Sequence, residues 1–129
     1  LDNIEHIFER QRLLKESFRG LKPEGTFILA MPNIRYIYFL ISLIFKGRFP
    51  KTSSDLEGYD GGHIHYFTFK DVEFLVRNIG FERVEKFGLF PWESFSFIGK
   101  IKDTVKSIFG KNFKREFFSS EVIVKARKP

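Results

Sequence analysis

The sequence contains no cysteine, one methionine, one tryptophan and three histidines among its 129 residues. Without cysteine, the chain cannot form a disulfide scaffold, a thiolate zinc site or a cysteine nucleophile, and it is compatible with a reducing cytoplasm. It also lacks an apolar run of the about 20 residues that a membrane-spanning helix needs. The apolar run from Ile34 to Phe45 is too short and is interrupted by Arg35.

The start of the sequence does not look like a translation start. The first residue is Leu1, the only methionine is Met31, and no charged segment typical of a signal peptide is present. We therefore expect the chain to be a piece of a longer protein whose upstream part is not included.

Two things are abundant: phenylalanine and positive charge. The chain has 18 Phe, and so much bulky apolar surface requires a sizeable core, a greasy pocket or an interface. The net charge is +6, and residues 91–129 hold nine Lys and Arg against four Asp and Glu. This basic final third favours an anionic partner, such as a phosphate-bearing substrate, nucleic acid or lipid headgroups. An ordinary solvated surface is the alternative.

Apolar spacing predicts the elements of the first half. Apolar residues at three- and four-residue steps indicate a helix over about residues 8–20, which the Lys22–Gly25 turn ends. The apolar run 26–31 predicts a strand buried on both faces, as in a parallel sheet. The apolar segment 34–45 then indicates a helix that is buried or faces an apolar ligand or a membrane. The polar segment 46–62 indicates a loop. We expect the aromatic side chains in this region to belong to the core rather than a pocket, namely Tyr36, Tyr38, Phe39 and Phe45.

In the second half, Thr68 and Asp71 resemble a capping box at the start of a helix that Gly80 ends. Loose alternation predicts strands at 81–90 and 121–127. Residues 91–117 form an insert in which apolar spacing from Ile98 to Phe109 predicts one helix, which serves as a lid, a membrane-surface helix or a packing helix. Helices alternating with strands indicate an α/β sheet, and the last two strands can pair antiparallel around the insert.

Three segments together resemble class I S-adenosylmethionine-dependent methyltransferases over roughly residues 1–90. Asp2–Ile7 is similar to the family's D-x-L-E-H segment, and Leu21–Gly25 followed by Pro32 and Asn33 is similar to its L-K-P-G-G … P-N turn and strand. His63–Thr68 followed by Ile79–Phe81 is similar to its H-x-R-x-F-T … A-G-F stretch. The resemblance is greatest to the branch that modifies glycans, lipids and quinones.

The resemblance implies a fold and a function. Residues 1–129 would be the C-terminal half of a Rossmann-like methyltransferase domain, with the last three strands of its sheet and the final strand antiparallel. Its partners would be the upstream half of its own domain and a small-molecule, glycan, lipid or quinone acceptor, methylated on oxygen from S-adenosylmethionine. The family's glycine-rich cofactor loop is absent from this sequence, so we expect the chain alone to be inactive. We expect a cytoplasmic protein with the capacity to associate with a membrane.

The resemblance also implies site residues near the start of the chain. Leu1, Asp2 and Ile4 match positions beside the cofactor. Asp2, Glu5 and His6, with His63 or His65 from the later loop, match a pattern that binds a divalent metal in some relatives. The alternative is that Glu5 and His6 only cap the helix.

Further candidates lie at the end of the first strand and in the later loop. His63 or His65 is a candidate general base for a hydroxyl acceptor, or a structural residue that anchors the loop. Asn33 ends a buried strand and is a candidate for substrate binding together with Tyr66, or else a turn-forming residue.

A second function is compatible with the same sequence. The basic final third and the phenylalanine-rich insert are also typical of a non-catalytic module that binds nucleic acid or an anionic membrane.

Overall fold

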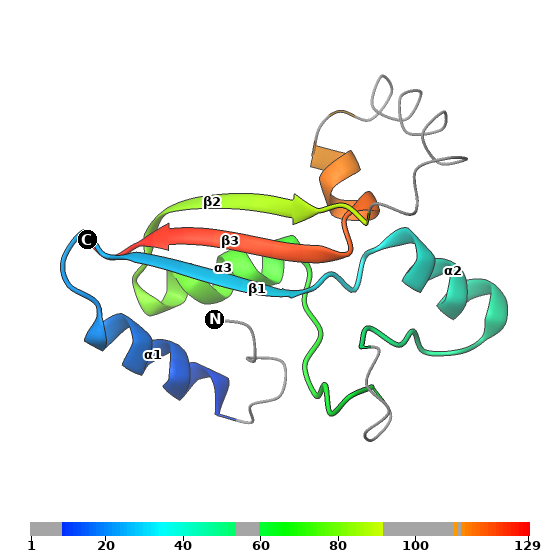
Figure 1. Cartoon of the computed structure of the whole chain (residues 1–129), viewed down its shortest axis with the longest axis horizontal. Coiled ribbons are helices and arrows are strands. Elements are labelled where there is room, and N and C mark those ends of the chain that lie inside the picture. Colours follow the sequence, from blue (N-terminus) through cyan, green and yellow to red (C-terminus); the bar gives the residue numbers. More distant parts are fainter. Residues whose placement is uncertain (1–8, 54–59, 92–109, 111) are drawn as a thin grey trace.

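The computed structural model describes residues 9–53, 60–91, 110 and 112–129, which form an α/β fold (Figure 1). The element order is α1 (Arg10–Gly20), β1 (Thr26–Pro32), α2 (Ile37–Lys46), α3 (Phe69–Ile79), β2 (Glu82–Leu89) and β3 (Glu121–Arg127). Residues 112–118, just before β3, are also helical. The predicted alternation of helices and strands is confirmed. The helix predicted between Ile98 and Phe109 lies outside the described residues.

The three strands form one sheet in the order β1-β3-β2, with β3 antiparallel to both neighbours. Pro32 of β1 and Leu89 of β2 both lie opposite Glu121 of β3. β1 and β2 therefore run in the same direction, and their carboxyl ends lie at the same edge of the sheet. This confirms the expectation of a final antiparallel strand, and the structure places that strand between the other two.

One face of the sheet forms the core together with α1 and α3 (Figure 1). Alternate side chains of β1 and β3 are buried against apolar residues of both helices. The core contains Leu14, Phe27, Leu29, Met31, Phe67, Phe69, Val72, Val76, Phe81, Val122, Val124 and Ala126. On the opposite face Ile28 is 52% exposed. The prediction that this strand is buried on both faces is therefore wrong, because α1 and α3 pack on the same side.

Local sequence signals explain where α3 begins and ends. The Thr68 hydroxyl accepts a hydrogen bond from the Asp71 N–H, and the Asp71 carboxylate accepts one from the Thr68 N–H, which completes the expected capping box. The helix ends at Gly80, whose φ of 113° is a conformation that other residues rarely adopt. The predicted cap and the predicted end are both confirmed.

Helix α2 lies beyond the end of the sheet (Figure 1) and has no buried residue. Gly47 ends it in a left-handed conformation with φ of 59°. Tyr36, just before the helix, is buried, but Tyr38 and Phe45 are exposed and Phe39 is only partly buried. The assignment of all four aromatic residues to the core is therefore wrong, because the strands and helices that the structure describes leave α2 without a buried residue. In the part of the chain that the structure describes, no helix is long and apolar enough to cross a membrane.

Candidate functional site

The carboxyl end of β1 is covered by the loop that precedes α3. Asn33 forms an isolated parallel bridge with Phe67, and the Ile34 N–H donates to the Phe67 carbonyl at 3.1 Å. In open α/β sheets, ligands bind just outside the carboxyl ends of the strands. Residues 60–68 therefore lie where this fold type places a ligand site.

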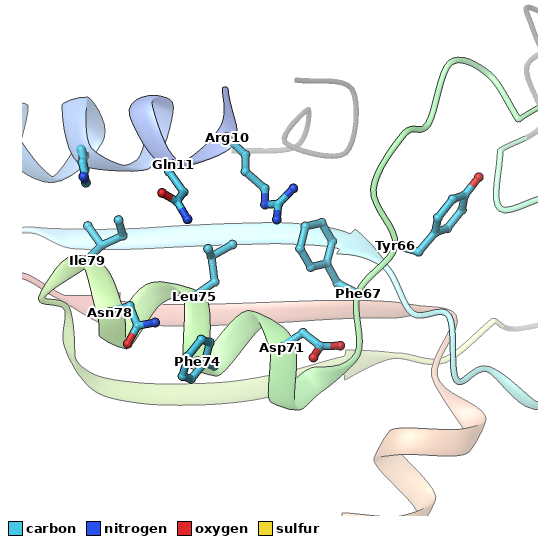
Figure 2. Close-up of a pocket in the computed structure, with 10 residues that line it drawn as sticks. Arg10, Gln11, Tyr66, Phe67, Asp71, Phe74, Leu75, Asn78 and Ile79 are labelled. Atoms are coloured by element: carbon cyan, nitrogen blue, oxygen red, sulfur yellow. The ribbon is translucent and has the colours of Figure 1, made fainter. Parts of the chain in front are cut away.

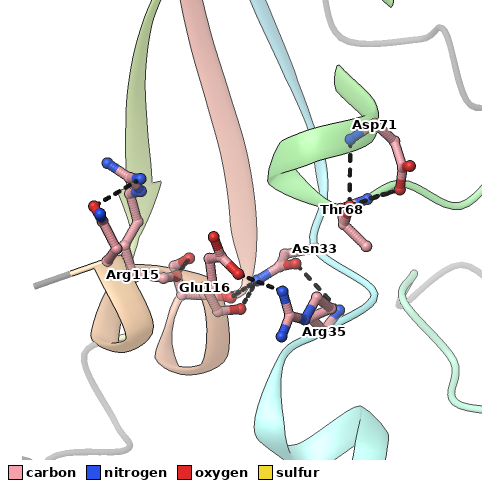
Figure 3. Close-up of polar contacts among 8 residues, drawn as sticks. Asn33, Arg35, Thr68, Asp71, Arg115 and Glu116 are labelled. Carbon is pink, nitrogen blue, oxygen red and sulfur yellow. Dashed lines mark hydrogen bonds and ion pairs between the residues drawn. The ribbon is translucent and has the colours of Figure 1, made fainter. Parts of the chain in front are cut away.

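Asn33 connects the end of β1 to the helical segment 112–118 (Figure 3). Its side chain is fully buried, and Nδ2 donates to the carbonyls of Glu116 and Ser119, each at 2.8 Å. Its Oδ1 accepts from the Arg35 N–H at 3.1 Å, and the Arg35 guanidinium pairs with the Glu116 carboxylate. Asn33 thus anchors the end of β1 to residues 116–119 through Nδ2 and supports the local turn through Oδ1, and its expected role in substrate binding stays a prediction.

Asp60 is a buried carboxylate at the centre of the loop, and its side chain accepts four hydrogen bonds. Its Oδ1 accepts from the N–H groups of Thr52 and Ser53, at 2.6 and 2.8 Å. Its Oδ2 accepts from the Thr52 hydroxyl at 2.7 Å and from the Tyr66 hydroxyl at 3.1 Å. The hydroxyl of Tyr66, predicted to bind substrate, therefore points to Asp60 and helps to hold the loop.

The environment of Asp60 keeps its carboxyl group ionised. Burial by itself raises the pKa of Asp60, but the hydrogen bonds from Ser53, Thr52 and Tyr66 outweigh burial and lower the pKa below its ordinary value. Asp60 therefore carries a negative charge at neutral pH inside the loop, where its side chain is only 1% exposed.

His63 lies next to this carboxylate, and the hydrogen bonds fix its tautomer. Thr52 Oγ1 is 2.7 Å from His63 Nδ1, and the Asp60 carboxylate is 3.7 Å from the same nitrogen. An ionised carboxylate only accepts, so the Thr52 hydroxyl donates to Asp60 and its oxygen accepts from Nδ1–H of His63. In the neutral imidazole, the unprotonated nitrogen is then Nε2. We call Asp60, Thr52 and His63 the relay.

His65 is oriented differently, toward the start of α1. Arg10 Nη1 is 2.8 Å from His65 Nδ1 and 3.1 Å from His65 Nε2, and the guanidinium lies 5.9 Å from the centre of the Phe67 ring. A guanidinium only donates, so one of these two ring nitrogens is the acceptor. A cavity of about 480 Å³ lies between α1 and α3. Arg10 and Phe67 are among the residues that line it (Figure 2). The loop that carries His65 thus contacts the start of α1.

The other predicted site residues lie outside the described residues. These are Leu1, Asp2 and Ile4, expected beside the cofactor, and the metal candidates Glu5 and His6 together with Asp2. Within the described ranges, no group of three or more His, Asp or Glu side chains could hold a metal ion. The metal site stays a prediction.

Two residues of the relay were missed by sequence reasoning. Asp60 and Thr52 lie in a segment that the sequence indicates only as a polar loop. The one available signal was Asp60 three residues before His63, since an acidic residue close to a histidine often orients its ring. Thr52 gave no signal, because its place beside His63 depends on how the loop folds back.

Comparisons with known proteins agree with this architecture. An uncharacterized protein of Methanocaldococcus jannaschii is 32% identical over 123 aligned residues, which cover 75% of this chain and 49% of that protein. The chain thus spans about half the length of the curated relative it matches. No family model matches the chain.

Two solved structures are similar in fold. One is an S-adenosylmethionine-dependent methyltransferase from Archaeoglobus fulgidus, with a TM-score of 0.59, 17% identity and coverage of 97% of this chain and 55% of that one. The other, from Thermotoga maritima, is described as an S-adenosylmethionine-dependent methyltransferase and possible histamine N-methyltransferase. It has a TM-score of 0.58, 17% identity and coverage of 98% and 52%. The chain therefore has the class I methyltransferase fold that its sequence motifs implied.

Proposed function

We propose that the whole protein transfers a methyl group from S-adenosylmethionine to an oxygen of a small-molecule, glycan, lipid or quinone acceptor. The chain described here would form the acceptor side of that domain, as its C-terminal half. The observation that carries the proposal is the relay of Asp60, Thr52 and His63 beside the carboxyl end of β1. It supplies a base where this fold type places its ligands.

The described residues do not fit the cofactor by themselves. The sequence contains no glycine-rich loop of the kind that lets a backbone approach a nucleotide cofactor. The expected positions Leu1, Asp2 and Ile4 lie outside the described residues. In this scheme the cofactor binds mainly to an upstream half of the domain. The present chain binds the acceptor and removes the proton of its hydroxyl group.

The relay would move the proton of an acceptor hydroxyl. As the acceptor O–H bond breaks, its proton passes to His63 Nε2 and its electron pair stays on oxygen, which becomes the better nucleophile. The positive charge that forms on the imidazole is stabilised through Nδ1–H, Thr52 and the Asp60 carboxylate. His63 is the catalytic residue in this scheme, and Thr52 and Asp60 are positioning residues.

The test uses the full-length protein with S-adenosylmethionine labelled in its methyl group and with lipid, glycan and polar extracts as acceptors. His63→Gln should reduce methyl transfer by about 10²–10⁴-fold, which is the usual contribution of a general base. The affinity for S-adenosylhomocysteine, measured by calorimetry, should not change.

A substitution at Thr52 separates a relay from a merely structural loop. Thr52→Val keeps the shape but removes the hydroxyl, so methyl transfer should be lost. Thr52→Ser keeps the hydroxyl, so methyl transfer should be retained. His65→Gln distinguishes the two histidines, and a larger loss there would transfer the role of base to His65.

Two outcomes would refute the proposal. The first is failure of the full-length protein to bind S-adenosylhomocysteine, combined with salt-sensitive binding of RNA, which would favour the non-catalytic module. The second is unchanged turnover in His63→Gln. Inactivation by a chelator and recovery with Mg²⁺ or Mn²⁺ would support the additional metal site of Asp2, Glu5 and His6.

A further inference from the structure

The helical segment 112–118 contacts the carboxyl edge of the sheet at two separate points. The Glu116 carboxylate pairs with the Arg35 guanidinium, which lies just beyond the end of β1 (Figure 3). The Arg115 guanidinium lies 5.2 Å from the centre of the ring of Phe69, the first residue of α3. The segment therefore contacts both the end of β1 and the start of α3.

The contact with the end of β1 is held by several groups at once. Asn33 Nδ2 donates to the Glu116 carbonyl, and Asn33 Oδ1 accepts from the Arg35 N–H. The Arg35 guanidinium also lies 4.3 Å from the centre of the Phe117 ring. The side chains of Arg35 and Glu116 are only 33% and 18% exposed. Loss of one partner would leave a partly desolvated charge behind, so this pair should matter more than a surface ion pair.

The same two places fix the loop that carries the relay. Asn33 forms the parallel bridge with Phe67, and the Ile34 N–H donates to the Phe67 carbonyl. Phe67 follows His63 by four residues in this loop. Two residues further on, Phe69 is buried at the start of α3. The end of the loop is therefore fixed between the end of β1 and the start of α3, which are the two places that the helical segment contacts.

We propose that Glu116 is a positioning residue for the relay and acts through Arg35 and Asn33 on the loop that carries His63. A general base must be held in a narrow geometry, because a shift of about 1 Å can cost about a hundredfold in rate. Residues 60–68 have no regular structure apart from the Phe67 bridge, and a loop holds a site less precisely than a helix or strand does. The helical segment supplies that support. This inference rests on the proposed function, because it concerns the same proton transfer.

The first measurement is methyl transfer by the full-length protein, with labelled S-adenosylmethionine and the acceptor extracts. Glu116→Gln keeps the shape of the side chain but removes its charge, and it should lower turnover about 2- to 30-fold, the range of residues that act through a contact network. The affinity for S-adenosylhomocysteine should not change. In a His63→Gln background the same substitution should have no further effect, because the base that Glu116 positions is already absent. A merely structural role would lower turnover in both backgrounds.

The second measurement observes His63 directly and needs no methyl transfer. Nitrogen-15 NMR of the imidazole reports which ring nitrogen carries the proton, and His63→Gln identifies the signals of His63. In the wild type, the neutral ring should carry its proton on Nδ1, which donates to Thr52. Glu116→Gln should shift these signals toward a mixture of both tautomers, and Thr52→Val should do so more completely.

Glu73→Gln is the matched control. Glu73 pairs with Lys86 between α3 and β2, and its side chain is 26% exposed, compared with 18% for Glu116. Glu73→Gln should leave both turnover and the His63 signals unchanged. Arg35→Gln removes the other partner of the Glu116 pair, and the double variant should lose no more turnover than the more impaired single variant. Circular dichroism should show the same fold for every variant; if Glu116→Gln does not fold, the double variant, which leaves no unpaired charge, provides the test.

Several results would overturn the proposal. One is unchanged turnover together with unchanged His63 signals in Glu116→Gln. Others are equal losses of turnover in the wild-type and His63→Gln backgrounds, or His63 signals that shift equally in Glu73→Gln. Absence of methyl transfer in the wild type would refute only the proposed function, because the NMR measurement still decides whether Glu116 positions His63.

Discussion

Replacing Asp60 with Asn tests whether the buried carboxylate organises the loop before α3. The substitution keeps the shape and leaves one oxygen to accept from the N–H groups of Thr52 and Ser53. The other oxygen becomes an NH₂ group that cannot accept from the hydroxyls of Thr52 and Tyr66.

The expected cost follows from those two lost hydrogen bonds. Hydrogen bonds to a charged group contribute about 1.5–3 kcal/mol each, and rotation of the two hydroxyls toward other partners recovers part of this. We expect Asp60→Asn to lower the free energy of unfolding by about 2–3 kcal/mol at neutral pH. The site is buried, so solvent should screen little of this effect.

Urea denaturation at several pH values measures the effect and its sign. The folded chain lowers the pKa of Asp60 below its ordinary value, so ionised Asp60 stabilises the fold above that value. This stabilisation is lost as the pH falls through the lower pKa of the folded state. The gap between wild type and Asp60→Asn should therefore narrow below about pH 4.

Asp71→Asn is the matched control, because Asp71 also accepts hydrogen bonds but is exposed at the start of α3. Asp71→Asn should lower the free energy of unfolding by about 1 kcal/mol or less. The reasoning would be refuted if Asp60→Asn lowered the free energy of unfolding no more than Asp71→Asn does. It would also be refuted if the difference in free energy of unfolding between wild type and Asp60→Asn stayed constant with pH.

Three further substitutions test other contacts by the same denaturation assay. Gly88→Ala should lower the free energy of unfolding by about 1–3 kcal/mol, because the new Cβ would lie 2.6 Å from the Cβ of Ser119. An unchanged free energy of unfolding would contradict the close approach of β2 to Ser119. Asn33→Ala should lower the free energy of unfolding by about 2–3 kcal/mol, because the carbonyls of Glu116 and Ser119 lose their donor. Wild-type stability in this variant would contradict the role of Asn33 as an anchor. Glu73→Gln should lower the free energy of unfolding by about 1 kcal/mol at neutral pH, because the hydrogen bond from Lys86 is the main cause of the lowered pKa of Glu73. This loss should shrink as the pH falls below the ordinary pKa of Glu73 and through its lower pKa in the folded state; a loss independent of pH would exclude the ion pair.

Much of the fold could be predicted because its signals are local. Thr68, Asp71 and Gly80 mark the two ends of α3 by their own backbone chemistry, and alternation at Val122, Ile123 and Val124 marks β3 and its buried face. The helical segment 112–118 was not predicted as a separate element. Contacts remote in sequence stabilise it there, such as those of Glu116 with Asn33 and Arg35.

The site was harder to predict because its contacts depend on loop conformation. The motif that contains His63 and His65 pointed to the correct loop, but it could not say which ring faces Thr52 and which faces Arg10. The exposure of α2 was misjudged for a related reason. Apolarity indicates that a side chain leaves water somewhere, but not whether its partner is the chain's own core or another surface.

The central position of β3 has a consequence for how the chain folds. β3 follows β1 and β2 in the sequence, yet it supplies every strand-to-strand hydrogen bond that holds the described sheet together. During synthesis, β1 and β2 would leave the ribosome with no partner strand between them, and the apolar side chains of β1 would stay open to wrong association. Pairing of Thr26 with Arg127 also closes a long loop, which raises the contact order and slows folding. The described sheet should therefore form only after β3 has been synthesised, rather than from an early hairpin of β1 and β2.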